Sequence, residues 1–155
     1  MKIKLLVIGK TDDKDLGQLI EKYQQRLNHY INFEIEIIPD IKNVKNLSQL
    51  QQKEKEGELI LSKLKNTDQL VLLDEKGKEY RSLDFANFLQ KKMNSGIKQL
   101  VLVIGGPYGF SESVYKKTMG KVSLSKMTFS HQMIRLFIVE QLYRGFTILK
   151  NEPYH

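Results

Sequence analysis

Two side chains that can do chemistry stand at the start of a long apolar segment near the C-terminus. His131 and Arg135 are four residues apart, so on a helix they share one face. We expect them at the N-terminal end of that helix, where the peptide dipoles leave a partial positive charge that favours an anion. Arg135 in this position could hold a phosphate or a carboxylate.

Two further residues with useful chemistry, Tyr154 and His155, end the chain. Tyrosine and histidine are suited to proton transfer and to stacking on a base. Chain ends are commonly frayed, however, and the residues alone predict a disordered tail.

A glycine-rich turn, IGGPYG at residues 104–109, follows an apolar run and could bring bare backbone up to a ligand. It is not the GxGxxG of dinucleotide-binding proteins, because its first two glycines are adjacent, and no Gly-Lys-Ser/Thr of a P-loop follows. A nicotinamide or nucleoside-triphosphate site is therefore disfavoured. The turn could receive a flat ligand such as adenine, or it could simply join a strand to a helix.

The segment LSKMTF at residues 124–129 mixes polar and apolar residues without a clear period. It lies between a short predicted strand and the apolar helix, so we expect a loop at the carboxyl ends of the strands, where α/β folds bind ligands. Such a loop can offer backbone groups to a nucleoside while Leu124, Met127 and Phe129 wall the pocket. The alternative is that Met127 and Phe129 are simply core residues.

The rest of the chain predicts the scaffold that positions these segments. Apolar or alternating runs predict strands at residues 2–8, 33–38, 69–74, 100–104 and 122–124, with 33–38 suited to a sheet edge. Helical spacing predicts helices at residues 15–28, 49–64, 82–93, 111–117 and 130–149. The expected caps are Asp12 or Asp13, Ser48, Ser82, Ser111 and Ser130.

Strands that alternate with helices, several of them apolar on both faces, indicate an α/β fold: a parallel sheet with helices on both faces. A length of 155 residues predicts one domain, residues 1–155. The last helix is apolar nearly all round, which suggests that a second subunit covers it.

Two polar features have two interpretations each. The helix predicted at 49–64 begins with an almost wholly polar run at 51–58, which favours a solvated face over a segment close to substrate. Glu140 and Arg144, four residues apart in the last helix, could form an ordinary intrahelical ion pair or a buried or interfacial one.

Composition narrows the functional classes. The chain has no cysteine, and its three histidines are dispersed, so neither disulfides nor a metal site is expected. No run is long enough for a membrane helix or a signal peptide, which predicts a cytoplasmic protein without a membrane partner. The net charge of +7 suits a polyanionic partner or a solvated lysine-rich surface.

Taken together, these motifs resemble a known family. The run at 129–135, the turn at 104–109, the polar EKEG at 54–57, EQLYR at 140–144 and the terminal Tyr154-His155 are similar to the ribosomal RNA large-subunit methyltransferase H family (RlmH) of the SPOUT class. The resemblance covers the whole chain. It implies an S-adenosylmethionine-dependent enzyme that methylates N3 of a pseudouridine in large-subunit (23S) ribosomal RNA, in assembled ribosomes. It also implies a homodimer and a C-terminal trefoil knot, a rare exception to unknotted topology.

The resemblance also implies a set of site residues. Cofactor contacts fall by position on Leu73, Gly105, Leu124, Ser125, Lys126, Met127, Thr128 and Phe129. His131, Arg135, Tyr154 and His155 are implied around the target nucleotide, with Arg135 on a phosphate or base carbonyl and Tyr154 or His155 orienting the base or taking its proton. The competing interpretation is a non-catalytic RNA- or ribosome-binding α/β module, which would not bind S-adenosylmethionine.

Overall fold

In a computed structural model, which describes residues 1–154, five strands form a single parallel sheet. The strands are β1 (Lys2–Ile8), β2 (Asn32–Ile38), β3 (Asp68–Glu79), β4 (Gln99–Ile104) and β5 (Gly120–Ser123). Their order across the sheet is β2-β1-β4-β3-β5, which places β2 at one edge as its alternating pattern predicted. The predicted parallel sheet is therefore confirmed.

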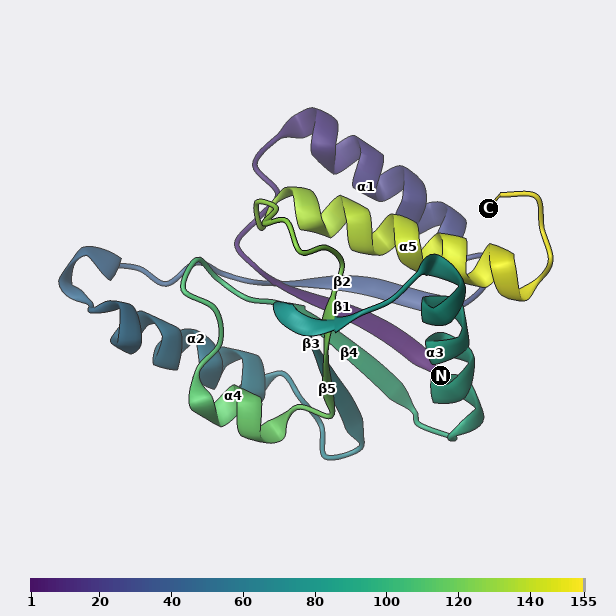
Figure 1. The fold of residues 1–155 in the computed structure, drawn as a ribbon. Coiled ribbons are helices and arrows are strands. Elements are labelled where there is room, and N and C mark those ends of the chain that lie inside the picture. Colours follow the sequence, from purple (N-terminus) through teal and green to yellow (C-terminus); the bar gives the residue numbers. More distant parts are fainter. Residues whose placement is uncertain (155) are drawn as a thin grey trace.

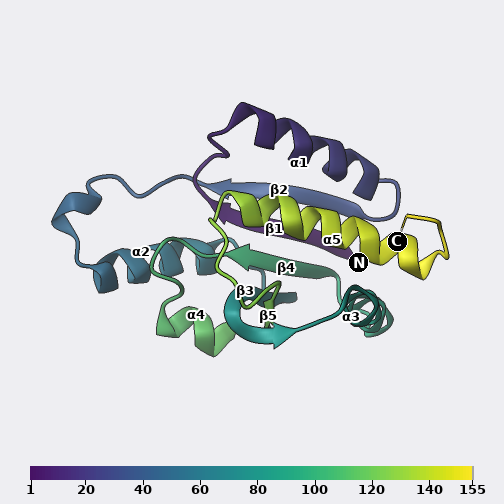
Figure 2. The same ribbon diagram turned by 45° about the horizontal axis from the view of Figure 1, so that its top comes forward.

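Helices cover both faces of the sheet, also as predicted. They are α1 (Lys14–Leu27), α2 (Gln49–Ser62), α3 (Ser82–Asn94), α4 (Glu112–Lys117) and α5 (Met133–Leu149), with a short 3-10 turn, η1, at Val44–Asn46. Helices α1, α5 and α3 lie side by side on one face, while α2 and α4 pack together on the other (Figures 1 and 2). Among the helices of the described chain, none has both the length and the apolar character needed to span a bilayer.

The strands bury side chains on both faces, so there are two cores. Ile3, Leu5 and Val7 of β1 point toward the layer of α1, α3 and α5, whereas Leu6 and Ile8 point toward the layer of α2 and α4. Successive residues of a strand face opposite sides, which is why a doubly covered strand reads as a continuous apolar run.

Helix α5 is the middle member of the larger layer. It runs between α1 and α3 on top of the sheet (Figure 2), and Ile138, Val139, Leu142 and Phe146 are buried there within one chain. Much of its apolar surface is thus covered without a second subunit, although Met133 at its start remains 39% exposed.

The helix starts follow the predicted capping chemistry in three of five cases. Asp13 accepts a hydrogen bond from the Leu16 amide, Ser48 forms a full capping box, and Ser111 caps α4. The other two differ. Arg81, not Ser82, is the N-cap of α3, and the Ser82 hydroxyl donates to Gln141 instead. Helix α5 begins at Met133, whose amide donates to the Ser130 hydroxyl at 3.1 Å.

Strand β3 is longer than the predicted 69–74 because it passes through a bulge. Val122 of β5 pairs first with Leu73 and then with Lys78, so residues 74–77 loop out between the two registers. Gly77 is needed in this loop, since a Cβ there would lie 2.7 Å from the Val122 nitrogen. The bulge sets Asp74 and Glu75 beside the carboxyl ends of β4 and β5.

Candidate functional site

A cleft of about 340 Å³ opens at the carboxyl ends of β4 and β5, beside the bulge of β3. This is the edge of a parallel sheet where loops from several strands converge. The cleft brings together the end of β3, the glycine turn and the loop before α5, as predicted. Of the eight residues implied as cofactor contacts, seven line it: Leu73, Gly105, Leu124, Ser125, Met127, Thr128 and Phe129.

Lys126 is the one implied contact that does not line the cleft. Its side chain is 87% exposed, with Nζ 3.9 Å from a Glu79 carboxylate oxygen. The loop makes a tight turn here, because the Ser125 hydroxyl accepts a hydrogen bond from the Met127 amide at 2.9 Å. Lys126 lies at the tip of this turn and points away from the cavity.

Two carboxylates that the sequence-based prediction did not include also line the cleft. The Tyr115 hydroxyl donates to Asp74 at 2.6 Å, and the Thr128 hydroxyl donates to Glu75 at 2.8 Å. Burial, reinforced by the Asp74 carboxylate, raises the pKa of Tyr115 to about 12, so its hydroxyl stays protonated at neutral pH. Asp74 and Glu75 directly follow the buried apolar run 70–73 of β3, which is the signal that could have identified them.

The glycine turn forms a wall of the cleft in which side chains have little room. A Cβ on Gly105 would lie 3.1 Å from the Phe110 ring, and one on Gly106 would lie 2.5 Å from both carboxylate oxygens of Glu56. Glycine at these two positions leaves bare backbone in this wall of the cleft.

The residues present fit S-adenosylmethionine, the cofactor that the resemblance implies. Leu73, Ile104 and Leu124 supply apolar walls for a flat base, and the glycine turn supplies backbone beside them. The sulfonium of this cofactor is cationic, and the Asp74 and Glu75 carboxylates place negative charge in the same cleft. Within residues 1–154, no three His, Cys, Asp or Glu side chains gather closely enough to hold a metal ion.

His131 lies on the rim of this cleft. It lines the same cavity as the cofactor loop, and it also lines a neighbouring cavity beside the loop after β1. The side chain is exposed. An exposed imidazole can donate or accept a hydrogen bond, so His131 is able to contact a substrate at this rim. That role stays a prediction.

Arg135 lies in the first turn of α5, as predicted, but its side chain is buried instead of open to an anion. The residue is only 2% exposed, and its guanidinium donates to the carbonyl oxygens of Ile8 at 2.8 Å and Gly9 at 2.9 Å. It also donates to the His131 carbonyl at 3.1 Å and to the Thr11 hydroxyl at 3.3 Å. These contacts occupy the guanidinium within its own chain, so a contact with a phosphate or a base carbonyl would have to replace them, and that role stays a prediction.

Arg135 instead joins two segments that are far apart in sequence. It ties the end of β1 to the turn that carries His131, and Gln132 adds a bond from its Nε2 to the Lys10 carbonyl at 3.1 Å. The predicted place at the start of the helix was correct for Arg135, but His131 precedes the helix, and four neutral acceptors surround the guanidinium in place of an anion.

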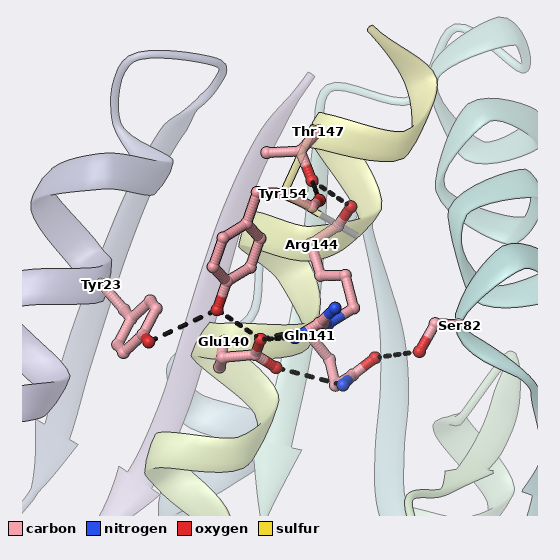
Figure 3. Close-up of polar contacts among 7 residues, drawn as sticks. All are labelled: Tyr23, Ser82, Glu140, Gln141, Arg144, Thr147 and Tyr154. Atoms are coloured by element: carbon pink, nitrogen blue, oxygen red, sulfur yellow. Dashed lines mark hydrogen bonds and ion pairs between the residues drawn. The ribbon is translucent and has the colours of Figure 1, made fainter. Parts of the chain in front are cut away.

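The tail is ordered as far as Tyr154. The Thr147 hydroxyl donates to the Tyr154 carbonyl at 2.6 Å, and the Tyr154 hydroxyl donates to Glu140 at 2.8 Å and lies 3.4 Å from the Tyr23 hydroxyl (Figure 3). The disorder expected from the residues alone is therefore wrong for Tyr154. His155, also predicted near the target nucleotide, lies outside the described residues.

Glu140 is the centre of this network. Arg144 pairs with it at 2.6 Å, and Gln141 links it onward to Ser82 of α3 (Figure 3). The pair is intrahelical and partly buried, which combines the two interpretations left open by the sequence. Tyr154 does not line the cleft of its own chain.

The family model and the similar proteins both match this chain over its full length. A family model described as a predicted SPOUT methyltransferase matches residues 1–155. Proteins named ribosomal RNA large subunit methyltransferase H are similar throughout: one from Flavobacterium johnsoniae is 73% identical over 155 residues, covering 100% of this chain and 99% of the relative. Others from Christiangramia forsetii and Porphyromonas gingivalis are 66% and 57% identical over the same shares of each chain.

Proposed function

The chain belongs to the SPOUT methyltransferase family, and on this premise we propose that it transfers a methyl group from S-adenosylmethionine to N3 of a pseudouridine in large-subunit ribosomal RNA. One observation carries most of the weight. The cleft at the carboxyl ends of the strands collects seven of the eight residues that the resemblance implies for the cofactor, from three separate segments of the chain.

When bound, S-adenosylmethionine supplies an electrophilic methyl group on a sulfonium. Leu73, Gly105 and the loop 124–129 would hold the nucleoside part, and the carboxylates of Asp74 and Glu75 complement the positive charge. N3 of pseudouridine carries a proton that must leave before the nitrogen can attack, so a positioned acceptor or a shifted pKa is required. Fixed orientation of the base against the cleft would supply much of the remaining rate enhancement.

His131 is the residue of this chain best placed to orient the base. It lines the cofactor cleft, it is exposed, and its backbone is fixed by the hydrogen bond from Arg135. Tyr154 is a poor candidate for the proton acceptor, because burial together with Tyr23 and Glu140 raises its pKa. We assign Tyr154 an orienting role rather than a proton-accepting one.

The remaining expectations are also proposals. The net charge of +7 supports binding to ribosomal RNA, and the relatives carry that substrate in their names. We propose that residues 1–155 act as one domain in the cytoplasm, as a homodimer without a metal, on assembled ribosomes. The trefoil knot of the family stays a prediction.

The decisive experiment is methyl transfer from labelled S-adenosylmethionine to ribosomes that lack the modification. We expect label in a single pseudouridine of the large subunit, identified by mass spectrometry of the released nucleosides. Label in another nucleoside, or none in pseudouridine, would refute the proposed substrate. Calorimetry on the protein alone separates an enzyme from a non-catalytic binding module, since the latter would show no saturable uptake of S-adenosylmethionine.

A further inference from the structure

Glu56 is buried in a helix whose polar sequence predicts a solvated face. It is 3% exposed, although Glu54 and Glu58 on the same helix are exposed as expected. Carboxylates are seldom fully buried unless they are paired with a cation or well hydrogen-bonded. The burial of the Glu56 side chain therefore needs an explanation from the groups that it contacts.

The partner that Glu56 meets is the glycine turn of the cofactor cleft. A Cβ on Gly106 would lie 2.5 Å from both carboxylate oxygens of Glu56, which is closer than real Cβ atoms approach. Its neighbour Gly57 is packed against Ser111 at the start of α4, where a Cβ would collide with the serine hydroxyl. Helix α2 thus lies flush against the segment 106–111, with the Glu56 carboxyl directly behind Gly106.

The hydrogen bonding of Glu56 is incomplete. Its Oε2 accepts from the Gln52 amide at 3.3 Å, a long bond, and its Oε1 has no hydrogen-bond partner among residues 1–154. A buried acceptor without a donor is costly, and far more so if it carries charge. An apolar side chain at this position would be buried at a lower free-energy cost. We therefore infer that the carboxyl group has a role that an apolar side chain could not fill.

We propose that Glu56 is a positioning residue of the cofactor cleft: its buried carboxyl, seated against Gly106, fixes the path of the glycine turn that receives S-adenosylmethionine. This inference rests on the proposed function, because it takes the cleft as the cofactor site. Glu56 does not line the cleft itself and acts through Gly106.

The surroundings favour the neutral form of the carboxyl. The titratable groups that face it are Asp40, from the segment after β2, and His131, from the turn before α5, while Gln52 faces it from α2. Burial raises the pKa of Glu56 and the Asp40 carboxylate raises it further, while the hydrogen bond from Gln52 and the nearby His131 oppose this; the net direction is upward. A protonated carboxyl avoids the cost of a buried unpaired charge.

The proposal can be tested by changing the side-chain volume on each side of the contact between Glu56 and Gly106. We expect Gly106→Ala to weaken S-adenosylmethionine binding by at least about tenfold, because the new methyl group collides with Glu56, and Glu56→Ala to weaken it by a similar factor. The double variant Glu56→Ala/Gly106→Ala should bind more tightly than Gly106→Ala alone, since the methyl group then fills the vacated space. Glu58→Ala, exposed on the same helix, is the matched control and should bind as the wild type does.

Two outcomes would overturn the proposal: unchanged cofactor affinity in Glu56→Ala, or a Gly106→Ala defect that removal of the Glu56 side chain does not relieve. If Glu56→Ala fails to fold, Glu56→Gln and Gly106→Ala decide, since the neutral isosteric glutamine should retain wild-type affinity. The amide resonances of Gly105, Gly106 and Gly109 give a readout that needs no cofactor. They should shift in Glu56→Ala even if the wild type bound no S-adenosylmethionine, so the two proposals can fail separately.

The neutral carboxyl also predicts how stability depends on pH. Because the pKa of Glu56 in the folded state lies above its ordinary value of 4.5, its contribution is fully present below pH 4.5 and is lost as the pH rises through the folded value. Glu56→Gln removes this titration. We expect the melting temperature of Glu56→Gln relative to wild type to increase as the pH rises above 4.5 and to level off once the pH has passed the folded-state pKa, and a difference independent of pH would contradict a raised pKa at Glu56.

Discussion

Replacing Arg135 with methionine is expected to lower the free energy of unfolding by about 3–5 kcal/mol, because it keeps the volume but leaves several buried carbonyl oxygens without their hydrogen-bond donor. The guanidinium is the donor for the carbonyls of Ile8, Gly9 and His131, all within 3.1 Å. Methionine fills the space but donates nothing, so these acceptors lose their partner, at a cost of about 1–3 kcal/mol for each one that stays buried. Urea unfolding measures the difference.

Cofactor binding should fall together with stability in this variant, since Arg135 fixes the turn that carries His131 on the cleft rim. The matched control is Arg81→Met, whose guanidinium is 80% exposed and pairs only with Asp84 at the surface; its urea midpoint should match that of the wild type. An Arg135→Met variant of wild-type stability that had lost only turnover would instead support a direct contact with RNA.

The burial of Arg135 shows what periodicity can and cannot predict. Spacing correctly placed Arg135 in the first turn of the last helix, although His131 lies in the turn just before it, and the helix N-terminus is a reasonable place for an anion. The acceptors it meets lie at the end of β1, more than a hundred residues earlier, and no local pattern encodes that approach. Glu56 shows the same limit of local pattern. Its polar run predicts solvent exposure, but the packing of α2 against the glycine turn buries the side chain.

The position of the cleft was easier to predict from the sequence than the surroundings of Arg135 and Glu56. Each strand ends in a turn or loop, and parallel strands bring those ends to one edge, so the meeting of residues 73, 105 and 124–129 follows from the order of elements. Asp74 and Glu75 were missed because their place depends on the bulge between the two registers of β3 and β5. Lys126 could be placed on the loop from the sequence, but its outward direction depends on the local turn at Ser125.

The second large effect is expected at the tail. Deleting residues 154–155 should lower methyl transfer by at least about 100-fold, the typical contribution of a group positioned for proton transfer or base orientation. Cofactor affinity should stay close to wild type, because Tyr154 does not line the cleft of its own chain. Single-turnover methylation of ribosomes and calorimetry with S-adenosylmethionine measure the two quantities separately.

Tyr154→Phe is the matched control for the hydroxyl. The phenylalanine ring would keep its packing against Tyr143, with the two ring centroids 4.8 Å apart, and against the Arg144 guanidinium. Only the hydrogen bond to Glu140 would be lost. Since the raised pKa keeps Tyr154 protonated at neutral pH, Tyr154→Phe should leave the shape of the pH–rate profile between pH 6 and 9 unchanged even where it lowers the rate. A lost ionisation in that profile would make Tyr154 the proton acceptor, and unchanged turnover after the deletion would remove the tail from the reaction altogether.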